Sequence, residues 1–194
     1  MKSLNNKIER STKLIQDLYI PRKPYNLGFS GGKDSIVLLD LAKKSGVNFK
    51  ATYSNTTLDP PLHIKFIRDN YPEVVIKNPE KSFYKLIQEK GFPSRIRRWC
   101  CEYLKESPGV EKRNLTGIRW EEGYKRKLYK PEMCDDRHQG TTRVNPILEW
   151  TSNEIWEYIK ENNLPYPYIY DPPYNFKRLG CVGCPLAPNP QRIR

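Results

Sequence analysis

Six consecutive residues, Ser30-Gly31-Gly32-Lys33-Asp34-Ser35, have the composition of a phosphate-binding loop. The two glycines allow the backbone to turn tightly and to approach a ligand without side-chain obstruction. The loop lies between an expected strand and an expected helix, so the free N–H groups of the first helical turn would point at a bound anion. The spacing differs from that of a P-loop, which needs four residues between the first glycine and Gly-Lys. We predict a phosphate site here; the alternative is a turn that only joins the two elements.

Four of the five cysteines form two pairs. Cys100 and Cys101 are adjacent, whereas Cys181 and Cys184 have the Cys-x-x-Cys spacing that lets both sulfur atoms reach one metal centre. Neighbouring side chains on a helix diverge by about 100°, which suits a single tetrahedral zinc poorly but suits a bulkier cluster of several iron atoms. We predict that these four cysteines hold a [4Fe-4S] cluster. A redox disulfide, plain thiols and zinc are the alternatives.

The fifth cysteine, Cys134, lies in a polar segment together with Asp135, Asp136 and His138. These residue types could form a metal site or support a reactive thiol. We interpret Cys134 as an ordinary loop residue, because its spacing matches neither cysteine pair.

The rest of the chain alternates between strand and helix patterns. Expected strands cover residues 25–29, 49–54, 74–76 and 114–118, and expected helices cover residues 4–19, 36–44, 63–70, 83–89 and 97–105. A further helix begins at Thr151, because Glu154 follows it at the spacing of a capping box. Residues 124–149 break the alternation and indicate a hairpin or a mobile loop.

This alternation indicates a doubly wound α/β fold with mostly parallel strands and helices on both faces of the sheet. No linker, repeat or low-complexity stretch interrupts the 194 residues, so we expect a single domain over residues 1–194. No apolar run approaches the roughly 20 residues that span a bilayer, and the first residues lack a secretory signal. We therefore expect a soluble cytoplasmic protein with no membrane partner. The net charge of +12 suggests an anionic partner.

Residues 30–35 resemble the pyrophosphate loop (PP-loop) of ATP pyrophosphatases, which cleave ATP between its α and β phosphates. The cysteine spacing resembles the iron–sulfur type of the phosphoadenylylsulfate (PAPS) reductase family, which includes assimilatory adenylylsulfate reductases. Further matching motifs are Thr116-Gly117-Ile118-Arg119 with Glu121 and Arg126, Asn145-Pro146-Ile147-Leu148-Glu149-Trp150-Thr151, and Arg178-Leu179-Gly180-Cys181 with Cys184-Pro185. The resemblance covers nearly the whole chain. It implies an adenine nucleotide α-hydrolase-like fold and nucleotide contacts from residues 30–35, Gly117 and Arg126.

The family contains two chemistries, and the sequence favours one of them. Sulfonucleotide reductases usually carry a degraded phosphate loop and attack sulfur with a cysteine in a C-terminal tail. Here the loop is intact and no cysteine follows Cys184. These departures favour relatives that spend ATP, such as the DNA phosphorothioation component with the same cluster. The alternatives are reduction of a sulfonucleotide with release of sulfite, and a nucleotide- or nucleic-acid-binding subunit that needs a partner for catalysis.

The resemblance implies a mechanism of adenylation with Lys33, Asp34 and Arg119 as catalytic residues. Lys33, the loop N–H groups and Mg²⁺ would hold the departing pyrophosphate. Asp34 would place the Mg²⁺, or would only cap the helix. An acceptor oxygen would attack the α-phosphorus, and a sulfur-donor protein would then supply the atom that displaces AMP. Arg119 and Arg126 would bind phosphate in a forked geometry, with solvated surface as the alternative for both.

Basic stretches interleaved with aromatic residues suggest nucleic acid as one possible acceptor. The stretches are residues 95–99, 125–127 and 177–178, and the aromatic residues are Trp99, Trp120, Tyr124 and Tyr129. The alternative is that Trp99 belongs to the core and that the charges form a solvated face.

Overall fold

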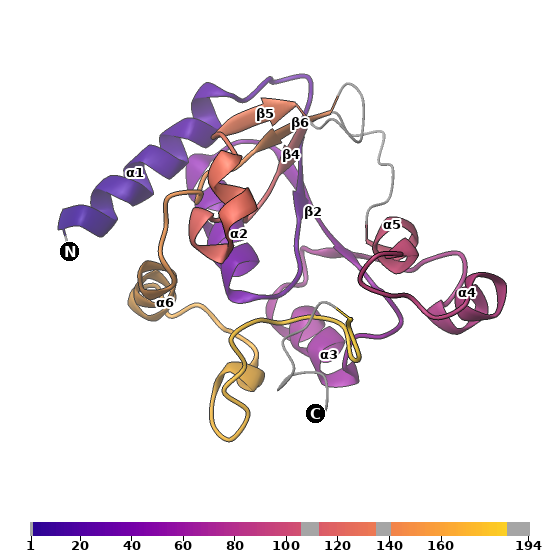
Figure 1. Ribbon diagram of the computed structural model, residues 1–194. Coiled ribbons are helices and arrows are strands. Elements are labelled where there is room, and N and C mark those ends of the chain that lie inside the picture. Colours follow the sequence, from indigo (N-terminus) through magenta and orange to yellow (C-terminus); the bar gives the residue numbers. More distant parts are fainter. Residues whose placement is uncertain (1, 106–112, 135–140, 186–194) are drawn as a thin grey trace. The chain divides into compact units, whose positions relative to one another are not determined.

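The chain folds into two compact units in the computed structural model, which describes residues 2–105, 113–134 and 141–185 (Figure 1). Unit 1 comprises Met1–Thr52 and Val110–Tyr166, and unit 2 comprises Tyr53–Gly109 and Pro167–Arg194. The expectation of one domain over residues 1–194 stays a prediction. The phosphate loop belongs to unit 1, and the two cysteine pairs belong to unit 2.

The framework is a mostly parallel sheet in the order β3-β2-β1-β4-β6-β5. Its strands are β1 (Tyr25–Gly28), β2 (Phe49–Ser54), β3 (Val75–Lys77), β4 (Arg113–Leu115), β5 (Glu132–Cys134) and β6 (Thr142–Val144). β1 pairs in parallel with β2 and β4, β4 pairs in parallel with β6, and β5 runs antiparallel to β6. Leu27 lies opposite Ala51 on one side and Leu115 on the other, and all three are buried. The predicted α/β fold with mostly parallel strands is confirmed.

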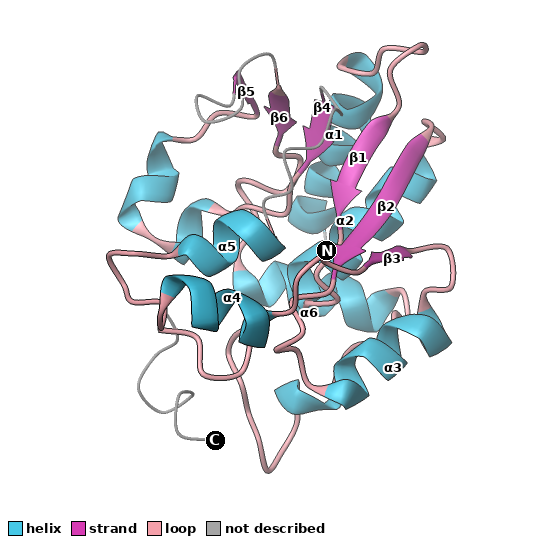
Figure 2. Ribbon diagram, turned by 90° about the vertical axis from the view of Figure 1, so that its right-hand side faces the viewer, coloured by secondary structure: helices cyan, strands magenta, loops and turns pink. Residues whose placement is uncertain are grey.

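Three helices of unit 1 cover one face of its strands (Figure 2). They are α1 (Lys2–Asp17), α2 (Lys33–Ser45) and α6 (Ser152–Glu161); two short 3₁₀ helices, η1 (Trp120–Glu122) and η2 (Tyr124–Leu128), follow β4. The capping box before α6 is confirmed, because the Thr151 side chain accepts from the Glu154 N–H and the Glu154 carboxylate accepts from the Thr151 N–H. Every described helix is too short or too polar to cross a lipid bilayer.

Unit 2 contains α3 (Pro61–Asn70), α4 (Phe83–Lys90), α5 (Trp99–Leu104) and a short 3₁₀ helix, η3 (Tyr168–Tyr170). Its apolar cluster consists of Phe83, Leu86, Trp99 and Leu104. Trp99 stacks on Phe83 with a centroid distance of 5.6 Å and an interplanar angle of 22°. The Trp99 indole N–H also donates to the Gly91 carbonyl over 3.2 Å, which fixes both ends of the connection between α4 and α5.

Two expected elements are shorter in the structure by two residues or more. The strand expected at residues 114–118 ends at Leu115, because the chain turns at Gly117 to approach Asp34 closely. The helix expected at residues 97–105 begins at Trp99, because Ser94 and Arg97 close a turn in front of it. Within residues 124–149, β5 and β6 form the antiparallel pair that a hairpin predicts.

Candidate functional site

The phosphate loop in unit 1 is a closed turn that ends at the uncapped start of α2. Gly31 has a φ of 70°, a left-handed conformation that favours glycine. The Ser35 hydroxyl accepts a hydrogen bond from the Ser30 N–H over 3.2 Å and donates one to the Gly32 carbonyl over 2.9 Å. Gly32 is the N-cap residue of α2, and no side chain caps this helix. A glycine at this position adds no N-cap side chain that would compete with an anion.

Lys33 and Asp34 are held together within the loop. The Lys33 side chain is only 7% exposed, and its Nζ lies 3.3 Å from Asp34 Oδ2. The other oxygen, Asp34 Oδ1, accepts from Arg119 Nε over 2.7 Å. Because Asp34 pairs with two cations and does not cap α2, the capping alternative is wrong. Each oxygen of Asp34 has one of these partners and keeps a second lone pair, so the predicted placing of Mg²⁺ by Asp34 stays a prediction.

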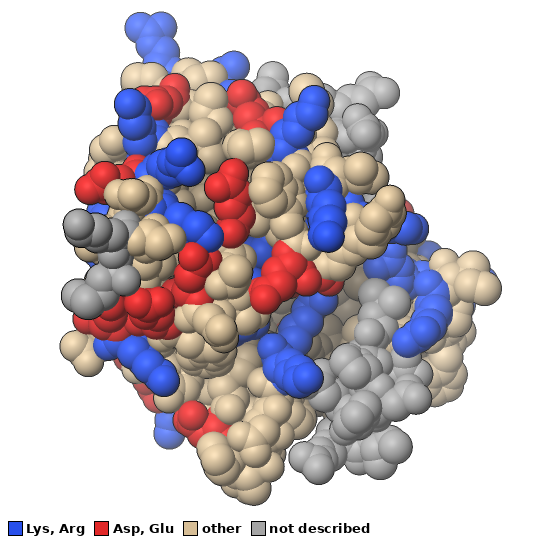
Figure 3. Space-filling model, turned by 60° about the vertical axis from the view of Figure 1, so that its left-hand side comes forward, with Lys and Arg blue, Asp and Glu red and all other residues tan. Residues whose placement is uncertain are grey.

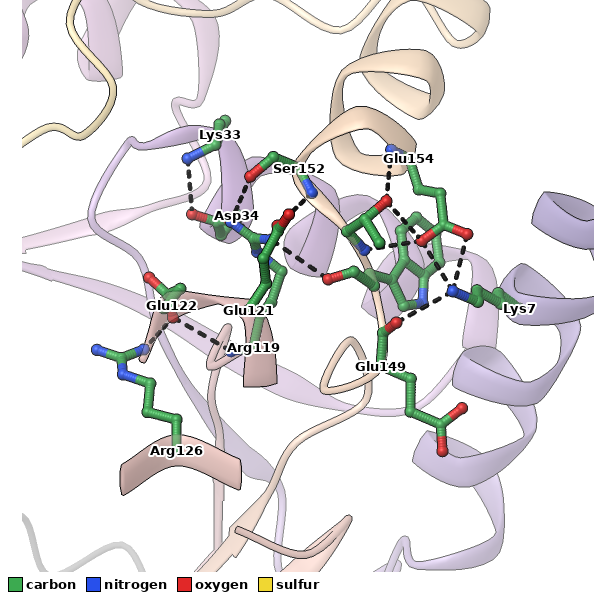
Figure 4. A network of polar contacts seen from close by, with 12 residues as sticks. Lys7, Lys33, Asp34, Arg119, Glu121, Glu122, Arg126, Glu149, Ser152 and Glu154 are labelled. Atoms are coloured by element: carbon green, nitrogen blue, oxygen red, sulfur yellow. Dashed lines mark hydrogen bonds and ion pairs between the residues drawn. The ribbon is translucent and has the colours of Figure 1, made fainter. Parts of the chain in front are cut away.

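Arg119 lies at the centre of the polar network in Figure 4. Its side chain is 3% exposed, and Nη1 donates to Glu121 Oε2 over 2.6 Å and to the Trp150 carbonyl over 3.2 Å. Nη2 donates to Ser152 Oγ over 3.2 Å, and the Ser152 N–H donates to Glu121 over 2.6 Å. The guanidinium group thus joins the phosphate loop to η1 and to the start of α6. Ser152 was not expected in the network, since no local pattern distinguishes it.

Electrostatics within unit 1 favour the charged forms of this network. Burial opposes the charge of Arg119, but the carboxylates of Asp34, Glu121 and Glu122 outweigh it and raise the Arg119 pKa. Partial burial alone would raise the pKa of Glu121, but the hydrogen bonds from Arg119 and Ser152 lower it below its ordinary value. The ion pairs therefore form a charged and fixed support for the loop.

Gly117 and Arg126 have clear structural partners near the loop. A Cβ added to Gly117 would lie 3.4 Å from the Asp34 carbonyl carbon, so glycine allows this close approach of two backbones. Arg126 forms an ion pair with Glu122, four residues earlier in the chain. Their predicted contacts with a nucleotide stay predictions.

Unit 2 places the two cysteine pairs on different supports. Cys100 and Cys101 lie on α5 and are partly buried. Cys181 and Cys184 lie in a turn where the Cys184 N–H donates to the Cys181 carbonyl over 3.3 Å. The turn is attached to unit 2 at three points: Cys181 Sγ to Thr56 Oγ1 at 3.5 Å, Val182 N–H to the Leu58 carbonyl at 3.1 Å, and Arg95 Nε to the Pro185 carbonyl at 3.1 Å.

Three of the four thiols in unit 2 are close enough to influence each other electrostatically. Burial, followed by the neighbouring Cys101, raises the pKa of Cys100 to about 11, and Cys181 contributes to the same shift. Desolvation opposes the charge of Lys105, but a hydrogen bond and the charge of Cys181, together with Asp59 and Cys101, raise its pKa.

The four thiols, none of which is in a disulfide, have the donor chemistry that an iron–sulfur cluster needs. Within the described part of the chain, however, no three His, Cys, Asp or Glu side chains are arranged to hold a metal ion. The residue types fit a cluster, whereas the cluster itself and its ligand geometry stay predictions. Cys134 is exposed in β5, and its neighbours at 135–140 lie outside the described residues.

Among the aromatic residues expected to stack on bases, Trp99 is part of the core. It is 5% exposed and packs on Phe83, so its interpretation as a base-stacking residue is wrong. Tyr124 is 83% exposed, as expected for a surface aromatic. Two further apolar side chains on the surface, Phe92 and Ile96, are 83% and 98% exposed, and no sequence pattern singled out Phe92.

The mostly parallel sheet and the loop before α2 define an α/β protein of the PP-loop superfamily. The chain belongs to the phosphoadenosine phosphosulfate reductase domain family, whose model matches residues 24–187. An uncharacterized protein of Methanocaldococcus jannaschii is 31% identical over 181 residues, covering 87% of this chain. This chain spans only 43% of that relative's length. The adenosine 5'-phosphosulfate reductase of Oceanobacillus iheyensis is 30% identical, with 80% of this chain and 68% of the relative covered.

Solved structures share the fold of the chain at low sequence identity. The phosphoadenylyl-sulfate reductase of Candida auris, in a phosphate complex, has a TM-score of 0.66 at 16% identity and covers 93% of this chain and 95% of its own. The FMN adenylyltransferase of Candida glabrata, in complex with FMN and an ATP analog, has a TM-score of 0.67 at 17% identity. It covers 93% of this chain and 63% of its own. At these identities the solved structures establish the fold of this chain.

Proposed function

We propose that the chain binds ATP at the phosphate loop, releases pyrophosphate and transfers the adenylyl group to an acceptor. Sulfur from a donor then displaces AMP from the adenylated acceptor. The observation that carries this proposal is the fixed pair of Lys33 and Asp34 beside the uncapped N-terminus of α2. A terminal pyrophosphate needs a concave set of N–H donors and a cation, and residues 30–35 contain both. A sulfonucleotide has no β,γ-pyrophosphate to occupy such a loop.

Each residue of the network has a distinct part in the proposed reaction. The N–H groups at the start of α2 and the Lys33 ammonium group stabilise the charge that grows on the leaving pyrophosphate. Asp34 orients Lys33, since its Oδ2 lies 3.3 Å from the ammonium nitrogen. Arg119 positions Asp34 through the 2.7 Å ion pair at Oδ1. Arg119 is buried among protein partners, which favours this positioning role over direct phosphate binding.

Cys100, Cys101, Cys181 and Cys184 would hold the iron–sulfur cluster in unit 2. A bound cluster supplies either one-electron chemistry or a rigid cross-link between α5 and the Cys-x-x-Cys turn. Within the protein itself, Thr56 and Leu58 position the turn through their hydrogen bonds to Cys181 and Val182. A sulfur-donor protein would complete the proposed reaction.

The experiment that tests this function measures pyrophosphate release from ATP and Mg²⁺ by protein purified without oxygen. We expect Lys33→Ala to lower the rate by a factor of about 100 or more, since a group that stabilises transition-state charge is lost. The matched control is Lys13→Ala, which removes an equal charge from an exposed position on α1. Equal rates in the two variants would contradict a role for Lys33, and no release by the unmodified protein would contradict the proposal.

A second candidate function is reduction of adenylylsulfate with release of sulfite. It is favoured by the relative from Oceanobacillus iheyensis, which is named adenosine 5'-phosphosulfate reductase and is 30% identical over 171 residues. Sulfite formation from adenylylsulfate and a thiol reductant, without pyrophosphate release from ATP, would replace the first proposal by this one. Nucleotide binding without either product would instead indicate a subunit that requires a partner for catalysis.

A further inference from the structure

We propose that residues 90–98, the basic loop, form a binding surface for single-stranded nucleic acid. This inference names the class of acceptor for the proposed adenylation, and that part of it rests on the proposed function. The binding itself is measured without ATP, so its failure can be distinguished from failure of the proposed reaction.

The basic loop exposes apolar side chains that a folded protein normally buries. Phe92 is 83% exposed and Ile96 is 98% exposed. The loop is nevertheless held in place. The Gly91 N–H donates to the Ile87 carbonyl over 2.8 Å, and the Gly91 carbonyl accepts from Trp99 over 3.2 Å. Because its ends are fixed on the apolar cluster of unit 2, the exposure of Phe92 and Ile96 is a feature of an ordered turn.

The charge of the basic loop has one sign. Arg95, Arg97 and Arg98 are exposed, and no acidic residue occurs between Lys90 and Cys101. Among the described residues, no carboxylate forms an ion pair with any of these three arginines; Arg95 donates to the Pro185 carbonyl. Three exposed guanidinium groups within four positions are therefore available to an anionic partner, and guanidinium is the cation that binds phosphate in a forked geometry.

The overall charge of +12 does not by itself select this loop. On the face in Figure 3, Lys and Arg side chains are interspersed with Asp and Glu, so the excess charge there is mixed with carboxylates. The 3₁₀ helix η2 shows the same mixing, because Arg126 pairs with Glu122 and the acidic residues 121–122 precede Lys125 and Lys127. The basic loop has no such compensation.

Planar rings beside the arginines favour single-stranded nucleic acid over an acidic protein. Tyr103 on α5 is 50% exposed, with Lys90 Nζ 4.3 Å from its ring centroid. Phe92 lies two residues beyond the end of α4, and its side chain has no polar atom to hydrogen-bond a peptide. Unpaired bases stack on such rings while their phosphates meet the arginines, and this combination is sequence-tolerant. An acidic polypeptide would use the charges but gain less from exposed rings.

The test is binding of a fluorescent 20-nucleotide single-stranded DNA of mixed sequence, followed by anisotropy at several salt concentrations. We expect Arg97→Ala/Arg98→Ala to weaken binding at least tenfold and to reduce the salt slope by about one, since each phosphate contact releases counterions. We expect Phe92→Ser/Ile96→Ser to weaken binding about tenfold with an unchanged salt slope, because stacking is lost and charge is kept.

Matched control variants come from exposed positions outside the predicted nucleic-acid contacts. Arg22→Ala/Lys23→Ala removes two exposed charges, and Tyr84→Ser/Leu62→Ser removes an aromatic and an aliphatic side chain that are 68% and 56% exposed. We expect both controls to bind within about twofold of the unmodified protein, and thermal unfolding should show all four variants folded. Equal losses in the loop and control variants would overturn the inference, because net charge alone would explain binding. Unchanged binding by Phe92→Ser/Ile96→Ser, or equal competition by polyglutamate at matched charge, would also overturn it.

Discussion

The phosphate loop of unit 1 and the cysteine pairs of unit 2 are supported in different ways. Around the loop, buried charged groups pair with one another: Asp34 with Lys33 and Arg119, and Arg119 in turn with Glu121. Around the cysteines, the contacts are mainly backbone hydrogen bonds, and the thiols stay partly exposed. Protein groups alone thus arrange the loop, whereas the proposed cluster would add metal–thiolate bonds to the cysteine region.

This difference suggests that unit 1 contains the site of group transfer and that unit 2 contains the cluster site. A site for a transferred group is most effective when its dipoles and charges are fixed before the substrate arrives. A cluster site can be looser, because metal–thiolate bonds order their ligands as they form. The predictions below test whether the two regions differ as described, from the largest expected effect to the smallest.

The largest expected effect is the loss of iron when a cysteine of unit 2 is replaced. We expect about four iron atoms per unmodified chain after anaerobic reconstitution, and near-complete loss in Cys181→Ser. Hydrogen exchange should then become faster in the described parts of unit 2, while residues 25–45 of unit 1 keep their protection. Cys134→Ser is the control, because this cysteine is exposed and lies outside the two pairs. Full iron content in Cys181→Ser, or equal loss in the control, would contradict the ligand assignment.

The next effect concerns the small apolar cluster beneath the cysteine pairs. Trp99→Ala should lower the free energy of unfolding by about 3 kcal/mol, since a buried aromatic side chain leaves a cavity. Trp99 also loses its stacking on Phe83 and its hydrogen bond to Gly91. Denaturant unfolding checks the stability, and ATP affinity of the folded protein should stay within about twofold. Trp99→Phe keeps most of the packing and should retain more than half of the lost stability; a similar destabilisation in both variants would argue against cavity formation.

A smaller effect is expected for the positioning residue of unit 1. Arg119→Lys keeps the positive charge but cannot contact Asp34, Glu121, the Trp150 carbonyl and Ser152 together. We expect the kcat for pyrophosphate release to fall about tenfold, equivalent to about 1.4 kcal/mol, with little change in the KM for ATP.

The distinction between kcat and KM decides the role of Arg119. A large rise in KM with unchanged kcat would instead indicate direct binding of the nucleotide. Arg126→Lys provides the comparison, because Arg126 pairs with Glu122 and, among the described residues, forms no bond to the phosphate loop. We expect its kcat to change less than twofold.

The smallest effect concerns acid stability at the start of α6. Burial alone would raise the pKa of Glu154, but hydrogen bonds from Lys7 and Thr151 lower it below the ordinary value of 4.5. A carboxylate with a lowered pKa stabilises the fold above its unfolded pKa, and this contribution disappears as the pH falls through its folded pKa. Glu154→Gln should therefore cost about 1 kcal/mol at pH 7 and flatten the decline in stability below pH 4.5.

Urea unfolding between pH 7 and pH 3 measures this effect. Glu149→Gln is a suitable control, because the Glu149 side chain is exposed. Lys7 contacts Glu149 only through its backbone carbonyl, which the substitution keeps. A decline with pH that is as steep in Glu154→Gln as in the unmodified protein would show that other groups dominate acid unfolding.

The sequence by itself determined the features that depend on neighbouring residues. The glycines of the phosphate loop, the Thr151–Glu154 capping box and the alternation of strands and helices each act over a few positions, so their patterns predict local structure. The strand at Phe49–Ser54 was predicted with its observed bounds. The family resemblance likewise rested on local motifs, and the family match over residues 24–187 confirms it.

Only the tertiary structure decided which distant groups meet. Asp34 forms an ion pair with Arg119, which lies far away in the sequence. This pairing replaces the helix-capping role that the local sequence allowed. Packing on Phe83 buries Trp99, whereas Phe92 and Ile96 of similar apolar character remain exposed. Burial and ion pairing depend on elements brought together by the sheet and the apolar clusters, and no spacing within a short window encodes them.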